Sequence, residues 1–434
     1  MDLPTTSSQQ KLFALQPGFT NLNHGSFGTV PLEILALQAS FSRRAEAKPD
    51  AWFRTDYFEH VDRARKSVAA LVNADVDDIV LLENASSAIN GILRSVVDWQ
   101  RGDKVLLLST AYRMCVEVLE WLVNTAGIEV VVVEVKFPYS QTELLQSVEG
   151  ALATLQAEQP RVALFSHISS MPTLIEPVEE LSRLVKQHAQ NCVVIIDGAH
   201  VPGALQLDLG GGGDTNAAQA MRPQGHSGSG SHYDYDFYTG NLHKWCFTPK
   251  GCAFLWTRPG SAGFQRAGAS GGVQPLVISS RADYTYTGRF AYTGTRDYTA
   301  WACIPASIEW VKRNFEGFEN MSARNHALIV AASRRVAALW GTSLLVPDED
   351  NVAVMADVVA PPLAQSEAQL QLIQQRMDLE HNIFFVYGKT NSNPAVWFVR
   401  LSAQVYLELI QFEAFASLFL DLLSSSITSS YSFS

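Results

Sequence analysis

A lysine and an aspartate stand in sequence surroundings that suit covalent cofactor chemistry. Lys244 lies in the run Asn241-Leu242-His243-Lys244-Trp245, and Asp197 ends an apolar run that starts at Val193. A lysine amine can hold an aldehyde cofactor as a Schiff base, and a carboxylate can keep a pyridine nitrogen protonated. We therefore interpret Lys244 and Asp197 as a pair that would bind pyridoxal 5'-phosphate (PLP) and act at the α-carbon of an amino acid.

The residues around Lys244 favour a partly buried amine over a solvated one. Aromatic and apolar residues flank it, and Pro249 and Gly251 lead into an expected strand, Cys252–Trp256. Desolvation near other cations would lower the pKa of this amine. A single lysine is usually a surface residue and a single Asp-Gly is usually a turn, so the interpretation depends on the two together.

A helix start after an apolar strand is a candidate phosphate site. The strand closes at Leu82, small and hydroxyl residues follow at Glu83–Asn90, and an apolar helical stripe continues through Val97. A helix N-terminus offers free N–H groups and the positive end of a dipole, to which Ser86 and Ser87 would add donors. The same pattern also fits a simple N-cap.

Short Val, Ile and Leu runs alternate with helical patterns and predict an α/β fold. Runs that are apolar on both faces are typical of parallel strands covered on each side. The expected strands are Ile79–Leu82, Val105–Leu108, Val130–Val135, Val162–Phe165 and Val193–Ile196, and a crossover helix is expected at Pro177–His188. An Asp at the end of such a strand lies where open α/β sheets bind ligands.

The C-terminal third predicts a smaller α+β domain. It combines expected helices at Ile304–Phe315 and Tyr406–Leu423 with expected strands at Val352–Val359 and Val396–Leu401. We expect an N-terminal arm at 1–30, a large domain at 31–303 with a flexible Gly/Ser-rich insertion at 209–232, a small domain at 304–423, and a frayed Ser-rich tail at 424–434.

Composition indicates a globular, cytoplasmic protein that acts on small molecules. A net charge of −11 without a basic cluster argues against nucleic-acid or anionic-membrane partners. We find neither a signal peptide nor an apolar run that could span a membrane. The five cysteines lack metal-ligand spacing, and His226 and His232 in the Gly/Ser-rich tract are more simply solvated residues, so no metal site is expected.

Taken together, the motifs resemble those of a known family. They are Asn21–Gly28, Asp197–His200, His243–Trp245, Tyr292–Asp297 and Arg400–Tyr406. The chain resembles class V aminotransferase-type, fold-type I PLP enzymes from about Leu22 to Leu420. Within them it is most similar to the isopenicillin N epimerase-like branch and its fungal-type hercynylcysteine sulfoxide lyases.

The resemblance implies roles for residues around the cofactor. Lys244 would bind PLP, Asp197 would pair with its ring nitrogen, and His200 would lie against its phenolic side. Ala85, Ser86, Asn241 and His243 would hold the phosphate. Thr295 would reach the phosphate of a neighbouring subunit, which implies a homodimer with shared active sites.

The resemblance also implies the residues that meet the substrate. Arg400 would clamp the α-carboxylate, for which a guanidinium fork is suited, whereas a surface ion pair is the plainer alternative. Asn23 and His24 would line the pocket, and Tyr112 would stack on the ring and handle protons. Arg113-Met114 replaces the Gly-Ala usual after this tyrosine, which leaves the substrate side chain open.

The expected reaction is β-elimination of sulfur from a cysteine conjugate, with hercynylcysteine sulfoxide as the first candidate. An amino-acid epimerase and a cysteine desulfhydrase are alternatives, and transamination stays open. A persulfide-forming desulfurase is disfavoured because it needs a mobile cysteine ahead of the arginine and no cysteine follows Cys303. A catalytically silent binding protein is disfavoured because it would have no use for Lys244, Asp197 and Arg400 together.

Overall fold

The computed structural model describes residues 8–155, 158–210, 233–261, 272–280, 283, 285–364, 366–392 and 394–430. Residues 211–232 of the expected insertion and 431–434 of the expected tail lie outside this part. Leu209, at the start of the expected insertion, is buried and its N–H donates to the carbonyl of Val72 at 2.8 Å.

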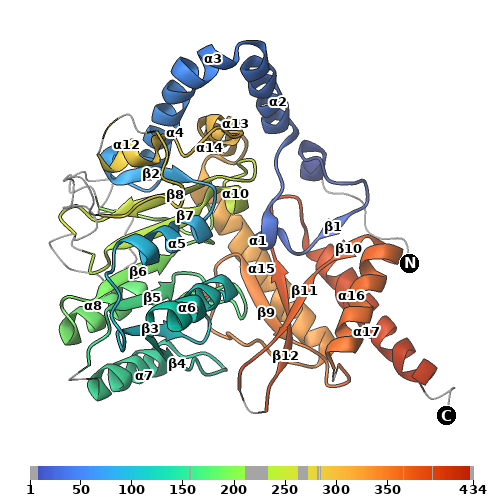
Figure 1. The fold of residues 1–434 in the computed structure, drawn as a ribbon. Coiled ribbons are helices and arrows are strands. Elements are labelled where there is room, and N and C mark those ends of the chain that lie inside the picture. Colours follow the sequence, from blue (N-terminus) through green and yellow to red (C-terminus); the bar gives the residue numbers. More distant parts are fainter. Residues whose placement is uncertain are drawn as a thin grey trace.

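A seven-stranded sheet forms the centre of the molecule (Figure 1). Its order is β2-β8-β7-β6-β5-β3-β4, and only β8 runs antiparallel to its neighbours. This confirms the predicted, mostly parallel α/β sheet. The strands are β2 (Ile79–Leu82), β3 (Lys104–Leu108), β4 (Glu129–Val133), β5 (Val162–Ser166), β6 (Val193–Asp197), β7 (Phe237–Asn241) and β8 (Ala253–Thr257).

Both faces of this sheet are buried, and successive side chains of a strand enter different cores. In β5, Ala163 and Phe165 join the larger apolar cluster while Val162 and Leu164 join the smaller one. The larger cluster includes α4 (Tyr57–Leu71), α7 (Gln141–Thr154) and α8 (Val178–His188). The smaller includes α5 (Ala85–Ser95), α6 (Arg113–Ala126) and α12 (Tyr286–Ala291).

The N-terminal segment runs from the C-terminal part of the chain to the central sheet (Figure 1). Its strand β1 (Thr20–Asn21) pairs with β10 (Ile383–Phe384), and α1 (His24–Phe27) contacts α10 (Leu242–Trp245). The other elements are η1 (Ser8–Leu12), α2 (Leu32–Ala47), α3 (Pro49–Ala51), η2 (Trp52–Asp56) and η3 (Val76–Asp78).

The C-terminal part has its own antiparallel sheet of β11 (Val386–Lys389), β12 (Trp397–Ser402) and β9 (Met355–Val359). The long helix α15 (Phe318–Trp340) packs against β9 and α17 (Leu409–Ser430). The remaining elements are α13 (Thr299–Ala302), α14 (Ile304–Phe315), η4 (Glu349–Asn351) and α16 (Glu367–His381). The predicted α+β character is confirmed, while the boundaries of the domains stay predictions.

Some elements differ from expectation. The strand expected at Val352–Val359 begins only at Met355, and the closing helix expected at Tyr406 begins at Leu409. That helix continues to Ser430, so residues 424–430 are helical where a frayed tail was expected. The pattern did not predict β7 or α15.

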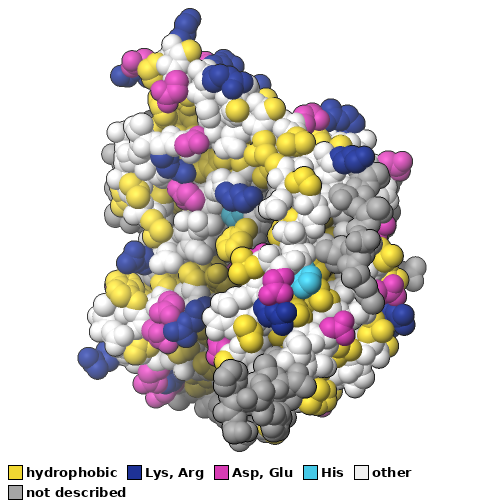
Figure 2. Space-filling view, turned by 90° about the vertical axis from the view of Figure 1, so that its right-hand side faces the viewer, with side chains coloured by type: hydrophobic (Ala, Val, Ile, Leu, Met, Phe, Trp, Pro, Cys, Tyr) yellow, Lys and Arg dark blue, Asp and Glu magenta, His cyan; other side chains and the backbone are white. Residues whose placement is uncertain are grey.

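The face in Figure 2 carries acidic and basic side chains interspersed, without one extended basic patch. Within the described ranges, no helix is long and apolar enough to cross a membrane.

Candidate active site

Asp197 and Lys244 lie at the same edge of the central sheet. β6 and β7 are parallel neighbours, and Asp197, the last residue of β6, pairs with Thr239 of β7. Two residues later β7 ends and the short helix α10 begins, which carries Lys244 and the buried Trp245. The two residues interact electrostatically. The structure therefore brings the predicted pair together.

The environment of Lys244 favours a neutral amine. Its Nζ lies 2.8 Å from Nε2 of His200. Burial lowers the pKa of Lys244 to about 7; Asp197 opposes this shift and the charge of Arg400 adds to it. A neutral amine is the form that can attack an aldehyde.

Asp197 is buried and held by two groups of the chain. Its Oδ1 accepts the N–H of Ala199 at 3.0 Å, and Sγ of Cys115 lies 3.9 Å from its Oδ2. Burial raises the pKa of Asp197, against the opposing effects of the Ala199 N–H and Lys244. A cation placed against this carboxylate would stabilise its charge, as a protonated pyridine nitrogen does.

A second buried carboxyl group, Glu176, lies near Asp197 and was not predicted. It accepts the Thr110 hydroxyl at 2.7 Å and the Ser166 N–H at 3.0 Å, and so ties the ends of β3 and β5 to the start of α8. Burial raises the pKa of Glu176 to about 8. Its sequence context, Ile-Glu-Pro before a helix, gives no signal of this position.

His200 is buried beside Lys244 with its second ring nitrogen open. Burial lowers the pKa of His200 well below its ordinary value, and the charges of Lys244 and Arg400 add to this. Among the described residues, Nδ1 of His200 has no hydrogen-bond partner. A neutral imidazole with one open nitrogen can accept or donate a bond to a ligand at this edge.

The predicted phosphate residues lie around the N-terminus of α5. Asn84 caps this helix by accepting the Ser87 N–H at 2.8 Å, and Asn241 accepts the Ala85 N–H at 2.9 Å. Ser86 lies between these two N–H groups, in the first turn. The Asn241 contact joins the lysine helix directly to the helix that would receive the phosphate.

His243 lies next to Lys244 with one ring nitrogen engaged. Its Nδ1 is 2.8 Å from the carbonyl oxygen of Cys252, which leaves Nε2 for other contacts. Burial lowers the pKa of His243 to about 4. If it contacts a phosphate, it does so as a neutral ring.

Arg400 is fully inside the protein, so the alternative of a surface ion pair is wrong. Its Nη1 donates to the carbonyl and hydroxyl of Ser170 at 2.9 and 3.0 Å, and its Nη2 to Asn23 Oδ1 at 2.6 Å and Ser26 Oγ at 2.9 Å. Burial lowers the pKa of Arg400 to about 10. All four acceptors are uncharged, so a carboxylate that replaces some of them would form charge-assisted hydrogen bonds to the guanidinium.

Asn23 and His24 are adjacent in sequence but contact different parts of the site. Asn23 contacts Arg400, but His24 is buried with Nδ1 2.8 Å from the Tyr406 hydroxyl and Nε2 2.8 Å from the carbonyl oxygen of Lys244. His24 was expected to line the substrate pocket. The structure instead gives both of its ring nitrogens to contacts within the protein, where it braces the backbone of the lysine helix.

Tyr112 lies before α6 with 50% of its side chain exposed, within electrostatic reach of Arg400. The unusual Arg113 points along the helix surface, where its Nε donates to Glu117 at 2.7 Å. Met114 contacts Asn90 of α5. Arg113 is therefore paired on the outside of α6.

Thr295 is exposed, and within the single chain its hydroxyl lies 2.6 Å from that of Tyr292. The adjacent Arg296 forms an ion pair with Glu83 at 2.9 Å, just before α5. The structure thus places this segment close to the α5 end without bringing Thr295 to Lys244.

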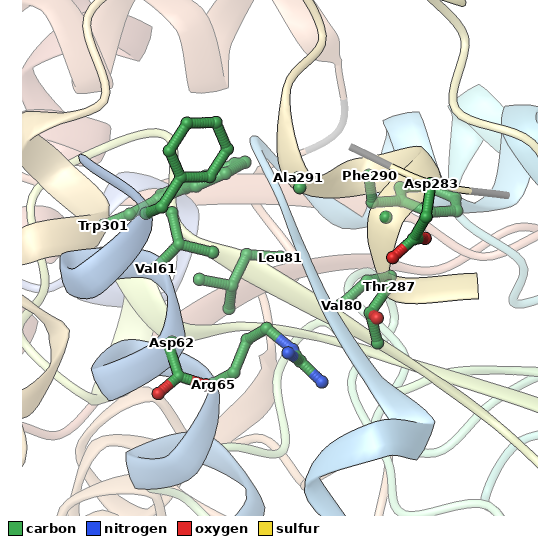
Figure 3. A pocket seen from close by; sticks show the side chains of 12 residues that line it. Val61, Asp62, Arg65, Val80, Leu81, Asp283, Thr287, Phe290, Ala291 and Trp301 are labelled. Carbon is green, nitrogen blue, oxygen red and sulfur yellow. The ribbon is translucent and has the colours of Figure 1, made fainter. Parts of the chain in front are cut away.

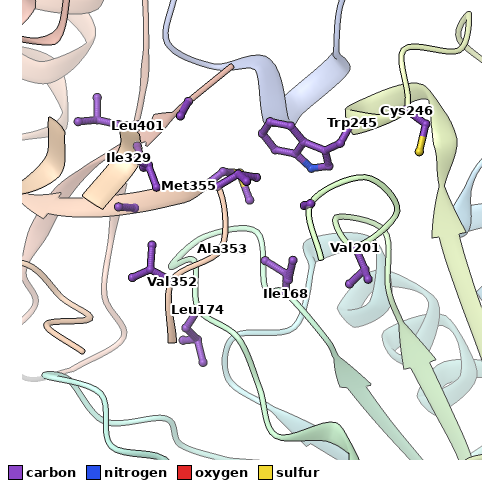
Figure 4. Packing of buried hydrophobic residues seen from close by; sticks show 14 of the residues in the cluster. Ile168, Leu174, Val201, Trp245, Cys246, Ile329, Val352, Ala353, Met355 and Leu401 are labelled. Atoms are coloured by element: carbon purple, nitrogen blue, oxygen red, sulfur yellow. The ribbon is translucent and has the colours of Figure 1, made fainter. Parts of the chain in front are cut away.

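Apolar packing fixes the lysine helix against the C-terminal part. Trp245, Met355 and Leu401 belong to one buried cluster, drawn in Figure 4. A separate pocket of about 190 Å³ lies elsewhere, between α4, β2 and α12, and includes Arg65, Asp62 and Thr287 (Figure 3). It contains none of the predicted site residues.

Comparison with known proteins agrees with this geometry. A family model described as Aminotransferase class-V matches residues 33–212. The chain belongs to this family. This class-V enzyme is 29% identical over 411 residues to the Arabidopsis thaliana protein named "Probable L-cysteine desulfhydrase, chloroplastic", covering 90% of this chain and 80% of the relative.

Two further relatives are 26% identical to this class-V enzyme. The hercynylcysteine sulfoxide lyase of Schizosaccharomyces pombe aligns over 96% of this chain and 97% of its own. The isopenicillin N epimerase of Streptomyces clavuligerus aligns over 78% and 80%. Among solved structures, the cystine C-S lyase C-DES with its product cysteine persulfide has a TM-score of 0.74 at 16% identity, covering 93% of this chain and 97% of that one, which shows the shared fold.

The cofactor of this class-V enzyme is pyridoxal 5'-phosphate. The residues present fit it: Lys244 has a lowered pKa, Asp197 is a buried carboxylate close to that amine, and Nδ1 of His200 has no partner among the described residues. At the α5 N-terminus the Ala85 and Ser87 N–H groups donate to Asn241 and Asn84, so the N–H and hydroxyl of Ser86 and the helix dipole are what this end would offer a phosphate.

Proposed function

We propose that this class-V enzyme is a carbon–sulfur β-lyase that acts on a cysteine conjugate, with a hercynylcysteine sulfoxide-like substrate as the first candidate. The observation that carries the proposal is the convergence of Lys244, Asp197 and Arg400 at one sheet edge. Support for the substrate class comes from relatives named as cysteine desulfhydrases and as a hercynylcysteine sulfoxide lyase.

Arg400 is proposed to bind the substrate carboxylate. Its Nη groups contact only neutral acceptors, which a carboxylate can displace in favour of two charge-assisted hydrogen bonds. Asn23 and Ser26 would orient the guanidinium until the substrate carboxylate takes their place. This fixes the α-carbon relative to Lys244.

Bound PLP withdraws electrons from the substrate α-carbon. Asp197 would keep the pyridine nitrogen of the cofactor protonated, and Ala85, Ser86, Asn241 and His243 would hold its phosphate. Lys244 Nζ takes the α-proton, for which a pKa of about 7 suits a general base. His200, 2.8 Å from that nitrogen, orients it.

Elimination follows when the β-carbon carries sulfur. The electron pair left at Cα by the removed proton forms the Cα–Cβ double bond. The carbon–sulfur bond breaks at the same time, and the sulfur leaves with its bonding pair. Tyr112 is proposed to give the sulfur a proton, and its position before α6 and its electrostatic interaction with Arg400 support this. Water then converts the unsaturated amino acid into pyruvate and ammonia.

Formation of a persulfide on an enzyme cysteine has less support. All five cysteines are buried, and Cys303 is the last in the chain. None lies on the segment between β9 and Arg400, so the sulfur is proposed to leave with its own substituent.

We further propose that the enzyme is a homodimer, in which Thr295 of each subunit reaches the phosphate of the other. The exposure of Thr295 in the single chain supports this. Its residence in the cytoplasm also stays a prediction.

The deciding experiment measures pyruvate release by the PLP-loaded enzyme from a panel of cysteine S-conjugates and their sulfoxides. We expect turnover of at least one class, loss of turnover in Lys244→Ala, and a raised KM in Arg400→Met. Lys250→Ala is the matched control, because Lys250 is an exposed lysine that donates to the carbonyl of Gly28 and is not among the groups that shift the Lys244 pKa.

Two outcomes discriminate the alternatives. Release of sulfide and pyruvate from free cysteine alone would identify a cysteine desulfhydrase. Entry of solvent deuterium at Cα without pyruvate would contradict β-elimination and favour an epimerase, as in the Streptomyces clavuligerus relative.

A further inference from the structure

Asp357 is a buried carboxyl group directly beside Arg400. The two residues are paired in the antiparallel register of β9 and β12, so their side chains project from the same face of that sheet. Each is only 2% exposed. Asp357 is far from Arg400 in sequence and has no motif around it.

Among the described residues, each of these two side chains has one buried polar atom without a hydrogen-bond partner. The Nη groups of Arg400 are engaged by Ser170, Asn23 and Ser26, but its Nε has no hydrogen-bond partner among the described residues. Asp357 Oδ2 accepts the Thr173 N–H at 2.5 Å, and within the same part of the chain its Oδ1 has no partner. Buried polar atoms are normally satisfied, and no hydrogen bond or ion pair joins these two described side chains directly, so one water between Oδ1 and Nε is the simplest solution.

The charges of the two groups depend on each other. Burial raises the pKa of Asp357 to about 8, against the Thr173 N–H and Arg400. Burial lowers the pKa of Arg400 to about 10, and Asp357 and Tyr112 oppose this. Among the described residues, Arg400 is thus the cation that favours ionised Asp357.

The other neighbours of the pair contribute little charge. On its other side Arg400 pairs with Val386 of β11, and the buried residues of α15, which packs against β9, are all uncharged. His326 of α15 contacts the carbonyl of Ala353. Towards the cofactor side, Lys244 and His200 interact electrostatically with Arg400.

A carboxylate bound at the front of Arg400 would share its cation with Asp357. The benefit that Arg400 gives to ionised Asp357 then falls, so the bound state favours a protonated Asp357. By reciprocity, the protonated form binds a carboxylate more tightly.

We propose that Asp357 is a positioning residue that acts through Arg400, holding the guanidinium from the side away from the substrate and taking up a proton when a substrate carboxylate binds. This rests on the proposed role of Arg400 as the carboxylate clamp. The consequence is a substrate affinity that falls as pH rises, without a matching change in the chemical step.

The test uses the PLP-loaded enzyme and methylthiopropionate, a carboxylate without an amine, so that neither Lys244 exchange nor a substrate amine adds its own titration. We expect its inhibition constant to rise through a midpoint at about pH 8. Each unit by which binding raises the Asp357 pKa weakens binding at high pH about tenfold. In Asp357→Asn the constant should stay low and flat, with kcat for a cysteine conjugate changing far less than KM.

Asp78→Asn is the matched control. Asp78 is another buried carboxyl group whose pKa is raised, to about 7, by burial and by Asp75 and Asp77. It lies before β2 of the central sheet, whereas Arg400 lies on β12 of the separate C-terminal sheet. It should keep the wild-type pH profile. A wild-type profile that persists unchanged in Asp357→Asn would overturn the proposal.

A second measurement does not depend on any variant folding. Calorimetric titration of the wild-type enzyme with methylthiopropionate, in two buffers of different ionisation enthalpy near pH 8, should show proton uptake. Absence of uptake despite binding contradicts the role of Asp357. If instead the ligand does not bind, or Arg400→Met binds it as well as wild type, the role of Arg400 fails, and with it the proposed function.

Discussion

At the scale of single residues, the site is built from charged side chains that burial makes neutral or nearly so. Lys244, His200 and His243 all have lowered pKa values, and burial is the largest cause in each case. Nucleophilic attack needs an unprotonated amine, which burial favours for Lys244. The cofactor would bring a charged phosphate and a charged pyridinium to these neutral side chains. The free-energy cost of burying Lys244, His200 and His243 therefore falls on residues that would contact the cofactor, and cofactor binding would offset part of it.

The attachment of PLP to Lys244 should therefore depend on pH in a defined direction. The pKa of Lys244 is lowered to about 7, so its reactive neutral form grows as pH rises through 7. At pH 7 that form is on the order of a thousandfold more abundant than for a lysine of ordinary pKa. Stopped-flow absorbance of the apoprotein mixed with PLP should show a rate that rises from pH 6 to 8 and then levels.

Arg400→Met sharpens this prediction, because Arg400 helps to lower the Lys244 pKa. The midpoint should move to higher pH in that variant and stay in place in Lys250→Ala. A wild-type midpoint near the ordinary lysine value, about 10.4, would show that Lys244 is solvated before PLP arrives.

Residue chemistry alone predicted part of this site. Lys244 and Asp197 were predicted from their strand surroundings, whereas the family resemblance assigned Arg400, and the structure places all three in or beside the site. Asp357 and Glu176 could not be predicted, because what makes them notable is a partner on another strand. The resemblance assigned His24 to the pocket, and its ring contacts with Tyr406 and the Lys244 carbonyl could not be predicted because both partners are distant in sequence.

At the scale of elements, the N-terminus of α5 joins helix stability to cofactor binding. Asn84 caps it through the Ser87 N–H at 2.8 Å, and Asn84→Ala should cost about 1 kcal/mol of stability. The same change loosens the turn that contains Ala85 and Ser86. We therefore expect weaker PLP retention as well, measured by equilibrium dialysis beside urea unfolding.

Ser140→Ala is the control for this prediction. Ser140 caps α7 by accepting the Glu143 N–H, away from the predicted site residues. It should lower stability by a similar amount and leave PLP retention unchanged. Equal PLP loss in both variants would mean that retention follows global stability, not the α5 end.

The elements that the sequence pattern did not predict have physical reasons. β7 contains Gly240 and Asn241, which lower strand propensity, and its stability comes from pairing with β6 and β8. In α15 much of the buried stripe consists of small residues such as Ala332 and Ser333, so its periodicity is faint. Its ends at Gly317 and Gly341 were visible signals, but they are typical of many loops.

At the scale of the whole molecule, the N-terminal arm joins the lysine helix to the C-terminal part. β1 pairs with β10, and His24 bridges the Tyr406 hydroxyl and the Lys244 carbonyl. Gly25 and Gly28 allow the close approach: a Cβ on Gly25 would lie 2.4 Å from Met355 Sδ, and one on Gly28 would lie 2.4 Å from the His243 carbonyl oxygen. The arm thus determines how tightly the lysine backbone is enclosed.

Gly28→Ala should open this enclosure. Gly28 has φ +68° and ψ 170°, a conformation that is nearly restricted to glycine and costs about 1 to 3 kcal/mol for other residues. The added methyl group would also overlap the carbonyl oxygens of His243 and Lys244, so the arm or α10 must move. We expect lower stability in urea unfolding together with faster PLP loss on dialysis.

Gly341→Ala separates backbone strain from the loss of close contact. Gly341 ends α15 with φ +64°, and a Cβ there would meet nothing within 4 Å. The free energy of unfolding of Gly341→Ala should therefore fall by about 1 kcal/mol, because alanine is strained in a left-handed conformation, and the variant should retain PLP fully. If Gly28→Ala retained PLP as well as Gly341→Ala does, the lysine helix would hold the cofactor without the arm, and the contacts of His24 with Lys244 and Tyr406 would serve folding alone.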